Sequence, residues 1–296
     1  MRMHMFETLA INWNVNPEIL SLGPIEIRWY SLLFISGFIL GWFIFRWFFK
    51  REGISEKLLD PLLYTLLAAT IVGARLGHCL FYEPAYYLTA EHFIEIFMPW
   101  RGGLASHGGT IAVVLSMVWF ARHYGRKHDF DFLWLVDRLS IAVCFAAAFI
   151  RLGNLFNSEI YGCATELPWG FVFERRGEVE PKHPTQLYEA LSYAILGLVL
   201  LFFYKKNPKG LYRGSYVGIF FTVLFGMRFL IEFVKENQVA FEDGMVLNMG
   251  QWLSVPFILL GVALSVYSYV KKMPTHVVRL EKPKAQQTHY AKSLSK

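Results

Sequence analysis

The chain has 296 residues, of which 55% are hydrophobic and 17% aromatic, and its mean hydropathy is positive. A chain this long and this apolar is not a soluble domain, and several of its runs reach the roughly 20 apolar residues that cross a bilayer. The net charge of +6 comes from short basic clusters between the apolar runs and in the C-terminal tail. This distribution favours membrane topology over a nucleic-acid groove, so no nucleic-acid partner is expected.

Seven apolar runs predict an all-α polytopic membrane protein. They cover residues 29–49, 58–81, 102–121, 132–152, 186–204, 215–234 and 249–270. Residues 1–22 lack the continuous apolar stretch of a cleaved signal peptide and are expected to lie as an amphipathic segment at the membrane interface. We expect residues 1–270 to form one transmembrane domain, and the basic residues 271–296 to form a disordered cytoplasmic tail.

Lys and Arg follow the first, third and fifth runs and fill the tail, whereas the alternate connectors contain fewer of them. The positive-inside rule therefore predicts an extracytoplasmic N-terminus and a cytoplasmic C-terminus. The connector 162–183, which we call the excursion, is then extracytoplasmic. Its segment 169–173 is typical of a short strand.

The densest polar cluster in apolar surroundings runs from Arg151 to Gly162, directly after the fourth run. On a continuous helix Arg151, Asn154 and Ser158 would share one face. Charge at membrane depth is costly and usually faces a partner or a wet cavity. Arg151 snorkelling to a headgroup, with the Asn side chains capping the helix, is the structural alternative. The density of the cluster favours a functional site.

Other polar side chains stand within or beside the apolar runs. Arg75 lies in the second run, and His107 stands among four glycines at the start of the third. Histidine suits proton transfer near neutral pH, although a lone histidine of this kind is more often a buried, hydrogen-bonded residue. After the excursion, His183, Gln186 and Glu189 are spaced to share one helix face.

Two ion pairs are predicted within apolar runs. Asp137 and Arg138 would form a buried structural pair near the cytoplasmic side, and Arg228 and Glu232 stand at i and i+4. The second pair would hold a functional cation inside the bilayer.

The arginines, histidines and carboxamides lie mostly towards the outer half of the predicted bundle. Arginine presents a planar fork of donors that matches phosphate oxygens, so a phospholipid is the indicated ligand. The sequence contains no P-loop, HExxH or G-x-S-x-G motif, and its three cysteines have no metal-binding spacing. No metal and no cofactor are therefore expected.

Six blocks resemble, in order and over nearly the whole chain, the bacterial phosphatidylglycerol–prolipoprotein diacylglyceryl transferase family. They are the blocks at 28–30, 73–77, 101–109, 151–162, 183–189 and 228–232. The fourth block is similar to the family pattern G-R-x-G-N-F-x-N-G-E-x-x-G. Ile150 stands in place of the leading Gly, Leu155 in place of the Phe and Ser158 in place of the second Gly.

The resemblance implies an inner-membrane transferase of lipoprotein biosynthesis with seven spans. Such an enzyme moves the diacylglyceryl group of phosphatidylglycerol to the lipobox cysteine of a prolipoprotein, forming a thioether and releasing glycerol 1-phosphate, before signal peptidase II acts. Because the substrate brings the thiol, no nucleophile motif is needed in the enzyme. The implied partners are phosphatidylglycerol, lipobox signal peptides and membrane lipids.

With this resemblance we expect Arg151 and Arg228 to bind the lipid phosphate and stabilise the leaving group, with Asn154 and Glu232 orienting them. His107 is the candidate base for the thiol, or alternatively a headgroup ligand. Eight further residues would shape the pocket or hold the excursion over it: Tyr30, Arg75, Asn157, Glu159, Gly162, His183, Gln186 and Tyr188.

Two other classes use similar features. A non-enzymatic carrier of an anionic phospholipid would need the same buried arginines, but its sequence should show repeated halves or paired broken helices, and neither is found. A retinal-type receptor is disfavoured because the last run has no mid-membrane lysine.

Overall fold

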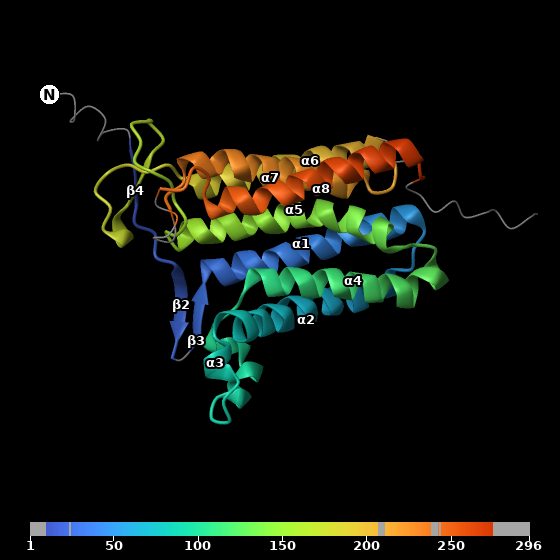
Figure 1. Cartoon of the computed structure of the whole chain (residues 1–296), viewed down its shortest axis with the longest axis horizontal. Coiled ribbons are helices and arrows are strands. Elements are labelled where there is room, and N and C mark those ends of the chain that lie inside the picture. Colours follow the sequence, from blue (N-terminus) through green and yellow to red (C-terminus); the bar gives the residue numbers. More distant parts are fainter. Residues whose placement is uncertain (1–9, 24, 207–210, 238–241, 243, 275–296) are drawn as a thin grey trace, which may run out of the picture.

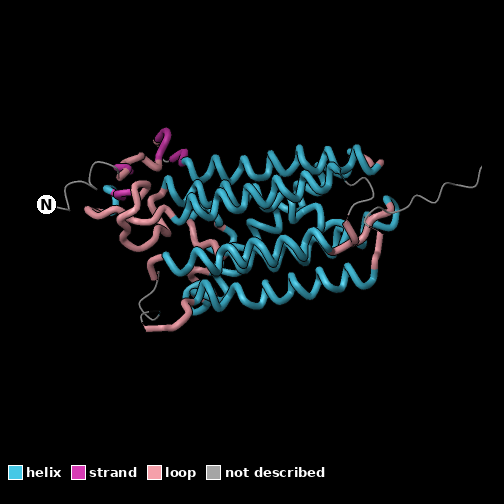
Figure 2. Tube along the Cα trace, turned by 90° about the horizontal axis from the view of Figure 1, so that it is seen from above, coloured by secondary structure: helices cyan, strands magenta, loops and turns pink. Residues whose placement is uncertain are grey.

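The computed structural model describes residues 10–23, 25–206, 211–237, 242 and 244–274. Within them, seven long helices lie side by side as a bundle, and short strands gather beyond one end of it, which we call the strand end (Figure 1). A view from above shows the strands beyond the same end of the helices (Figure 2). The long helices are α1 (Trp29–Glu52), α2 (Leu59–Gly77), α4 (Ser106–His128), α5 (Phe132–Phe156), α6 (Thr185–Lys206), α7 (Ser215–Ile231) and α8 (Met249–Lys271).

Six of these helices are long and apolar enough to cross a membrane by length and composition. The helix left out is α4, because the polar residues of its first turn and the basic residues of its last turn lower its mean hydropathy. The predicted run at 102–121 thus begins as a helix only at Ser106 and continues to His128. Seven long helices were predicted and are found, while the seventh span stays a prediction.

Local sequence signals set several helix ends. Gly53 ends α1 with φ 70°, a left-handed conformation that glycine adopts without strain. Asp131 precedes α5 and accepts from the Trp134 amide at 2.8 Å. At the start of α8 the Asn248 and Gln251 side chains each accept from the other residue's backbone N–H, which forms a capping box.

Glycines bring two pairs of helices into close contact. A Cβ on Gly73 of α2 would lie 2.3 Å from the Ala112 Cβ of α4, and a Cβ on Gly108 would lie 2.6 Å from the Gly77 Cα. On the other side of the bundle, a Cβ on Gly218 of α7 would lie 3.0 Å from the Gly261 carbonyl oxygen of α8. These contacts are the small-residue packing expected between helices that lack a hydrophobic driving force in lipid.

The end of the bundle opposite the strands is the basic end, where α1, α4, α6 and α8 finish with Lys or Arg in their last turns (Figure 1). Asp137 and Arg138 are both buried here and interact electrostatically, but no direct ion pair joins them among the described contacts. Arg138 instead pairs with Glu52 of α1 at 2.9 Å, and Asp137 accepts from the backbone amides of Gly214 and Val217 at the start of α7. Adjacent residues on a helix point in different directions, so they reach different partners.

Extended segments build the strand end. β1 (Ile11–Trp13) pairs in parallel with β4 (Phe171–Phe173), and β2 (Glu18–Leu22) forms an antiparallel hairpin with β3 (Ile25–Arg28). β4 confirms the strand predicted within the excursion. The N-terminal segment predicted to be amphipathic is thus partly strand, and its residues 1–9 lie outside the described part. The predicted tail lies outside it from residue 275 onward.

Candidate active site

The last turn of α5 and the turn after it form a hydrogen-bonded polar cluster. Arg151 donates from Nη1 to the Asn154 carboxamide oxygen at 3.1 Å. Asn154 and Asn157 both donate to Oε1 of Glu159, at 2.7 and 3.1 Å. The predicted grouping of these four residues is therefore present, and Glu159 is the acceptor that fixes both carboxamides. Ile150 lies within the unbroken helix, so its departure from the family pattern does not interrupt α5.

Ser158 does not lie on the predicted helix face, because α5 ends at Phe156 and the chain turns sharply. Ser158 has φ 52° and Ile160 has φ 63°, a left-handed conformation that costs non-glycine residues about 1–2 kcal/mol each. The Ser158 hydroxyl is buried and has no hydrogen-bond partner among the described residues. Strain of this kind persists where surrounding contacts fix it, and it is common at functional sites.

Residues from α6 hold this strained turn in place. Gln186 donates to the Glu159 carbonyl at 2.7 Å, and Thr185 donates to the Ile160 carbonyl at 2.8 Å. Gly162 follows the turn in close contact with other backbone, since a Cβ there would lie 2.3 Å from the Val234 carbonyl oxygen. Gln186 and Gly162 therefore help to fix the backbone conformation of this turn.

Glu189 of α6 is the centre of a buried charge network. Its Oε2 lies 2.9 Å from Arg151 Nε, and its Oε1 lies 3.5 Å from Lys235 Nζ and accepts from the Tyr193 hydroxyl at 3.1 Å. Glu189 is fully buried and the Lys235 side chain is only 1% exposed, whereas the Arg151 side chain keeps 14%. Sequence reasoning assigned no role at the site to Glu189, Tyr193 or Lys235. For Glu189, the sequence signal that could have found it was its spacing from Gln186, which places both residues on one helix face.

The predicted ion pair between Arg228 and Glu232 is absent from the described residues. The Glu232 backbone N–H still donates to the Arg228 carbonyl, but its carboxylate points to the start of α8, where a Cβ on Gly250 would lie 2.4 Å from Glu232 Oε1. Glu232 pairs with Lys235 at 3.0 Å instead. Arg228 is half-buried and makes no hydrogen bond or ion pair with any other described side chain, yet it lies near enough to Tyr193 to interact electrostatically.

Tyr30, in the first turn of α1, packs against α5 below this cluster. A Cβ on Gly153 would lie 2.7 Å from the Tyr30 ring, so the glycine lets the aromatic side chain approach the helix. The Tyr30 hydroxyl lies within electrostatic range of both Arg151 and Glu159. This position agrees with the prediction that Tyr30 lies near Arg151 and Glu159.

His183 and Tyr188 hold the excursion at the start of α6. The Tyr188 hydroxyl accepts from Trp169 Nε1 at 3.0 Å and lies 3.1 Å from His183 Nδ1. Burial lowers the pKa of His183, which favours the neutral imidazole. A second attachment is Lys182, whose Nζ lies 2.6 Å from the Glu236 carboxylate after α7. These contacts fix the excursion over the ends of α5 and α7.

Arg75 belongs to a separate cluster on the connector between α2 and α4. Its guanidinium is buried, donates to the Ile96 and Gly102 carbonyls at 3.2 and 2.6 Å, and lies over the Tyr87 ring at 4.8 Å. Its donors therefore shape this connector. His107, in the first turn of α4, is exposed and has no hydrogen bond or ion pair with another described residue. No described contact joins His107 or Arg75 to Arg151.

The arrangement can bind an anion at the end of a membrane bundle. Arg151 and Lys235 pair with the carboxylates of Glu189 and Glu232, and Arg228 interacts electrostatically with Tyr193 in the same cluster. Lys235 is enclosed by both carboxylates, and Arg151 is oriented by Glu189 and Asn154. Among the described residues, Arg228 makes no hydrogen bond or ion pair through its guanidinium, whose donors suit a phosphate oxygen.

Comparison with known proteins decides the family. The family model described as prolipoprotein diacylglyceryl transferase matches residues 17–267. The chain belongs to this family. It is 45% identical over 276 residues to the phosphatidylglycerol–prolipoprotein diacylglyceryl transferase of Bacteroides fragilis, covering 89% of this chain and 97% of the relative. The protein of the same name from Tolumonas auensis is 46% identical over 261 residues, covering 88% and 98%.

A third relative with this name, from Porphyromonas gingivalis, is 43% identical over 270 residues, covering 86% of this chain and 94% of its own. The sequence resemblance to the prolipoprotein diacylglyceryl transferase family is thus confirmed. The residues that the family model matches include the whole polar cluster, from Tyr30 on α1 to Lys235 after α7.

Proposed function

We propose that the protein transfers the diacylglyceryl group of phosphatidylglycerol to the lipobox cysteine of prolipoproteins, the first step of lipoprotein maturation. Family membership and the names of the relatives support this activity. The observation in the chain itself that carries the proposal is Arg228, a half-buried guanidinium without a described partner, in the same cluster as the partly exposed Arg151. An uncompensated cation at that depth suits an anionic lipid headgroup.

The reaction proceeds by displacement at carbon. The cysteine thiolate attacks the glycerol carbon that carries the phosphate ester, a carbon–sulfur bond forms, and the carbon–oxygen bond to the phosphate breaks. Glycerol 1-phosphate leaves with the electron pair, and the thiol proton passes to a base. Arg228 and Arg151 bind the phosphate and stabilise the charge that gathers on it, while Glu189 and Asn154 orient Arg151.

His107 is proposed as the base. Its imidazole is exposed at the strand end and makes no hydrogen bond or ion pair with another described residue. When the lipobox thiol binds between His107 and the arginines, His107 can accept its proton without contacting Arg151. His107→Gln and His107→Asn should both abolish thioether formation, and full activity in either variant would remove His107 from this role.

The proposal places the protein in the bacterial inner membrane with seven spans, the strand end and the N-terminus outside, and the basic tail in the cytoplasm. The basic last turns of α1, α4, α6 and α8, all at the opposite end, support this orientation through the positive-inside rule. The cluster around Arg151 then lies where the outer-leaflet lipid and the exported lipobox meet.

The test is a transfer reaction with purified protein, phosphatidylglycerol and a lipobox peptide, followed by the mass of the peptide. We expect a mass increase equal to one diacylglyceryl group, and its loss in Arg228→Ala. Arg28→Ala is the matched control, because Arg28 lies at the same end but is exposed and paired with Glu26 at 2.6 Å. An unchanged peptide mass would refute the transferase and favour a lipid carrier.

A further inference from the structure

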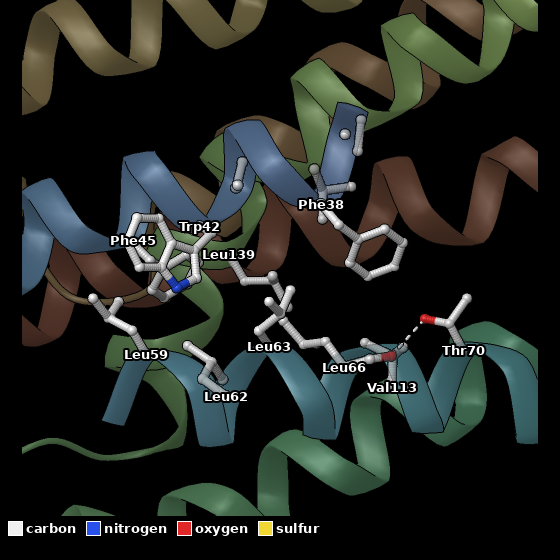
Figure 3. A pocket seen from close by; sticks show the side chains of 15 residues that line it. Phe38, Trp42, Phe45, Leu59, Leu62, Leu63, Leu66, Thr70, Val113 and Leu139 are labelled. Atoms are coloured by element: carbon white, nitrogen blue, oxygen red, sulfur yellow. Dashed lines mark hydrogen bonds between the residues drawn. The ribbon is translucent and has the colours of Figure 1, made fainter. Parts of the chain in front are cut away.

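A cavity of about 140 Å³ lies between α1, α2 and α5, with Val113 of α4 also in its lining, and Figure 3 shows the side chains around it. Among the described residues that line it, the one hydroxyl belongs to Thr70, which donates to the Leu66 carbonyl of its own helix at 2.8 Å. Water would find too few hydrogen-bond partners in this space. An apolar cavity of this kind stays dry or accepts an apolar ligand.

Small residues on two facing helices create the cavity. Near its outer end Gly37 of α1 meets α5 closely, since a Cβ there would lie 3.1 Å from the Ala146 Cα. One turn further along α1 the spacing is wider, and a Cβ on Gly41 would have its nearest neighbour, the Ala142 Cβ, at 3.9 Å. Neither helix fills the space beside Gly41, so the cavity can accept atoms there without displacing backbone.

The cavity lies further along α5 towards the basic end than the polar cluster, on a different side of the helix. Ala146 and Leu139 line it five and twelve residues before Arg151. At about 1.5 Å per residue these positions are about 8 and 18 Å from Arg151 along the helix axis. One leaflet contributes about 15 Å of hydrocarbon to the bilayer. The cavity therefore lies at the depth of the deeper part of an acyl chain whose phosphate is bound at Arg151 and Arg228, and the chain reaches it by passing around the side of α5.

The inner end of the cavity has a fixed floor. Trp42 lies across it beside Phe45 and Leu59, at the end opposite Phe38 (Figure 3). The Trp42 indole donates from Nε1 to the Asp60 carboxylate at 3.1 Å, which holds the ring in this position. A chain that enters from the polar cluster would stop at this floor.

We infer that this cavity receives the terminal part of one acyl chain of the donor phospholipid, and that its floor limits the chain length which the enzyme prefers. The inference rests on the proposed function, since it concerns the lipid whose phosphate binds at Arg151 and Arg228. Chain-length preference is then a property of α1, α2 and α5, separate from headgroup recognition at the strand end.

Gly41→Leu is the test variant, because its side chain extends into the cavity from a position with room for a Cβ. The purified protein is given equal amounts of dilauroyl and distearoyl phosphatidylglycerol with a lipobox peptide. Mass spectrometry then measures the ratio of the two lipidated products. Excluding about two methylenes should shift this ratio towards the lauroyl product on the order of tenfold.

Leu63→Ala is the opposite variant, since it enlarges the same cavity and should shift the ratio towards the stearoyl product. Ile39→Trp is the control, because Ile39 lies on α1 but is 54% exposed towards lipid, and its ratio should stay that of the unmodified protein. If Gly41→Leu fails to fold, Leu63→Ala decides alone. Unchanged ratios in the folded variants, with transfer intact, would overturn the inference, whereas no transfer by the unmodified protein would overturn the proposed function instead.

Discussion

Replacing Glu189 by Gln tests the buried network that orients Arg151. Glu189 Oε2 lies 2.9 Å from Arg151 Nε and Oε1 lies 3.5 Å from Lys235 Nζ, with Glu189 fully buried. Gln keeps the shape of the Glu189 side chain but removes the negative charge that Arg151 and Lys235 share. Removing one partner of a buried pair costs about 3–5 kcal/mol. We expect the free energy of unfolding to fall by about 3 kcal/mol, and the melting temperature by about 6–12 °C.

A double-mutant cycle isolates the contribution of the pair. Lys235→Met alone leaves Glu189 and Glu232 facing each other without the ammonium between them, and should destabilise to a similar extent. The double variant removes one charge of each sign. Its loss should therefore be smaller than the sum of the single losses by about 1–3 kcal/mol.

The assay is thermal unfolding of the purified proteins in detergent, followed by intrinsic fluorescence, with transfer to a lipobox peptide measured below the lowest melting temperature. Glu189→Gln should lose at least about tenfold in transfer, because Arg151 is no longer held in place. Glu26→Gln is the matched control, since that carboxylate pairs with an exposed arginine and should cost less than about 1 kcal/mol. Additivity of the two single variants within about 0.5 kcal/mol would refute a coupled network.

Three further predictions concern the turn, the helix packing and the excursion. Ser158→Gly should raise the free energy of unfolding by about 1 kcal/mol, since glycine relieves the φ of 52° and removes an unsatisfied hydroxyl, and an unchanged or lower melting temperature would contradict this. Gly73→Ala should lower the melting temperature because its Cβ would lie 2.3 Å from the Ala112 Cβ, whereas Gly226→Ala, with open space around it, should change it little. Burial lowers the pKa of His183, so its stabilising contribution is present above about pH 6.5 and is lost as the pH falls through the lower, folded-state value. The protection of the excursion's amides, measured as hydrogen exchange relative to the intrinsic rate at each pH, should therefore fall in mildly acidic buffer, and His183→Gln should remove this fall.

Length and hydropathy were enough to predict the long helices. The fourth run was expected to end near residue 152, and α5 continues to Phe156 because its last turn is stabilised by side-chain contacts among Arg151, Asn154 and Glu159. The same stretch was predicted as a polar cluster from density alone. Local spacing thus located the residues, while the turn that ends the helix depends on contacts from α6.

Pairing between charges was predicted less well. The i and i+4 rule joined Arg228 to Glu232, and the backbone does keep these residues in helical register, but the carboxylate pairs with Lys235 instead. Lys235 stands in a polar connector, where its sequence neighbourhood suggests solvent. Its ammonium is buried between Glu232, three residues earlier, and Glu189, 46 residues earlier in the chain. The contact with Glu189 has no periodicity from which it could be predicted.

The parallel pairing of β1 with β4 has a consequence for biosynthesis. Ile11 is in register with Phe171, so the N-terminal strand has no partner until more than half of the chain has been made. With the proposed orientation, residues 11–13 must wait outside the membrane while four helices are inserted. Contacts so distant in sequence form slowly. The pair of β1 with β4 is therefore completed late, after α5 with Arg151 and Asn154 has been made and before α6 brings Glu189.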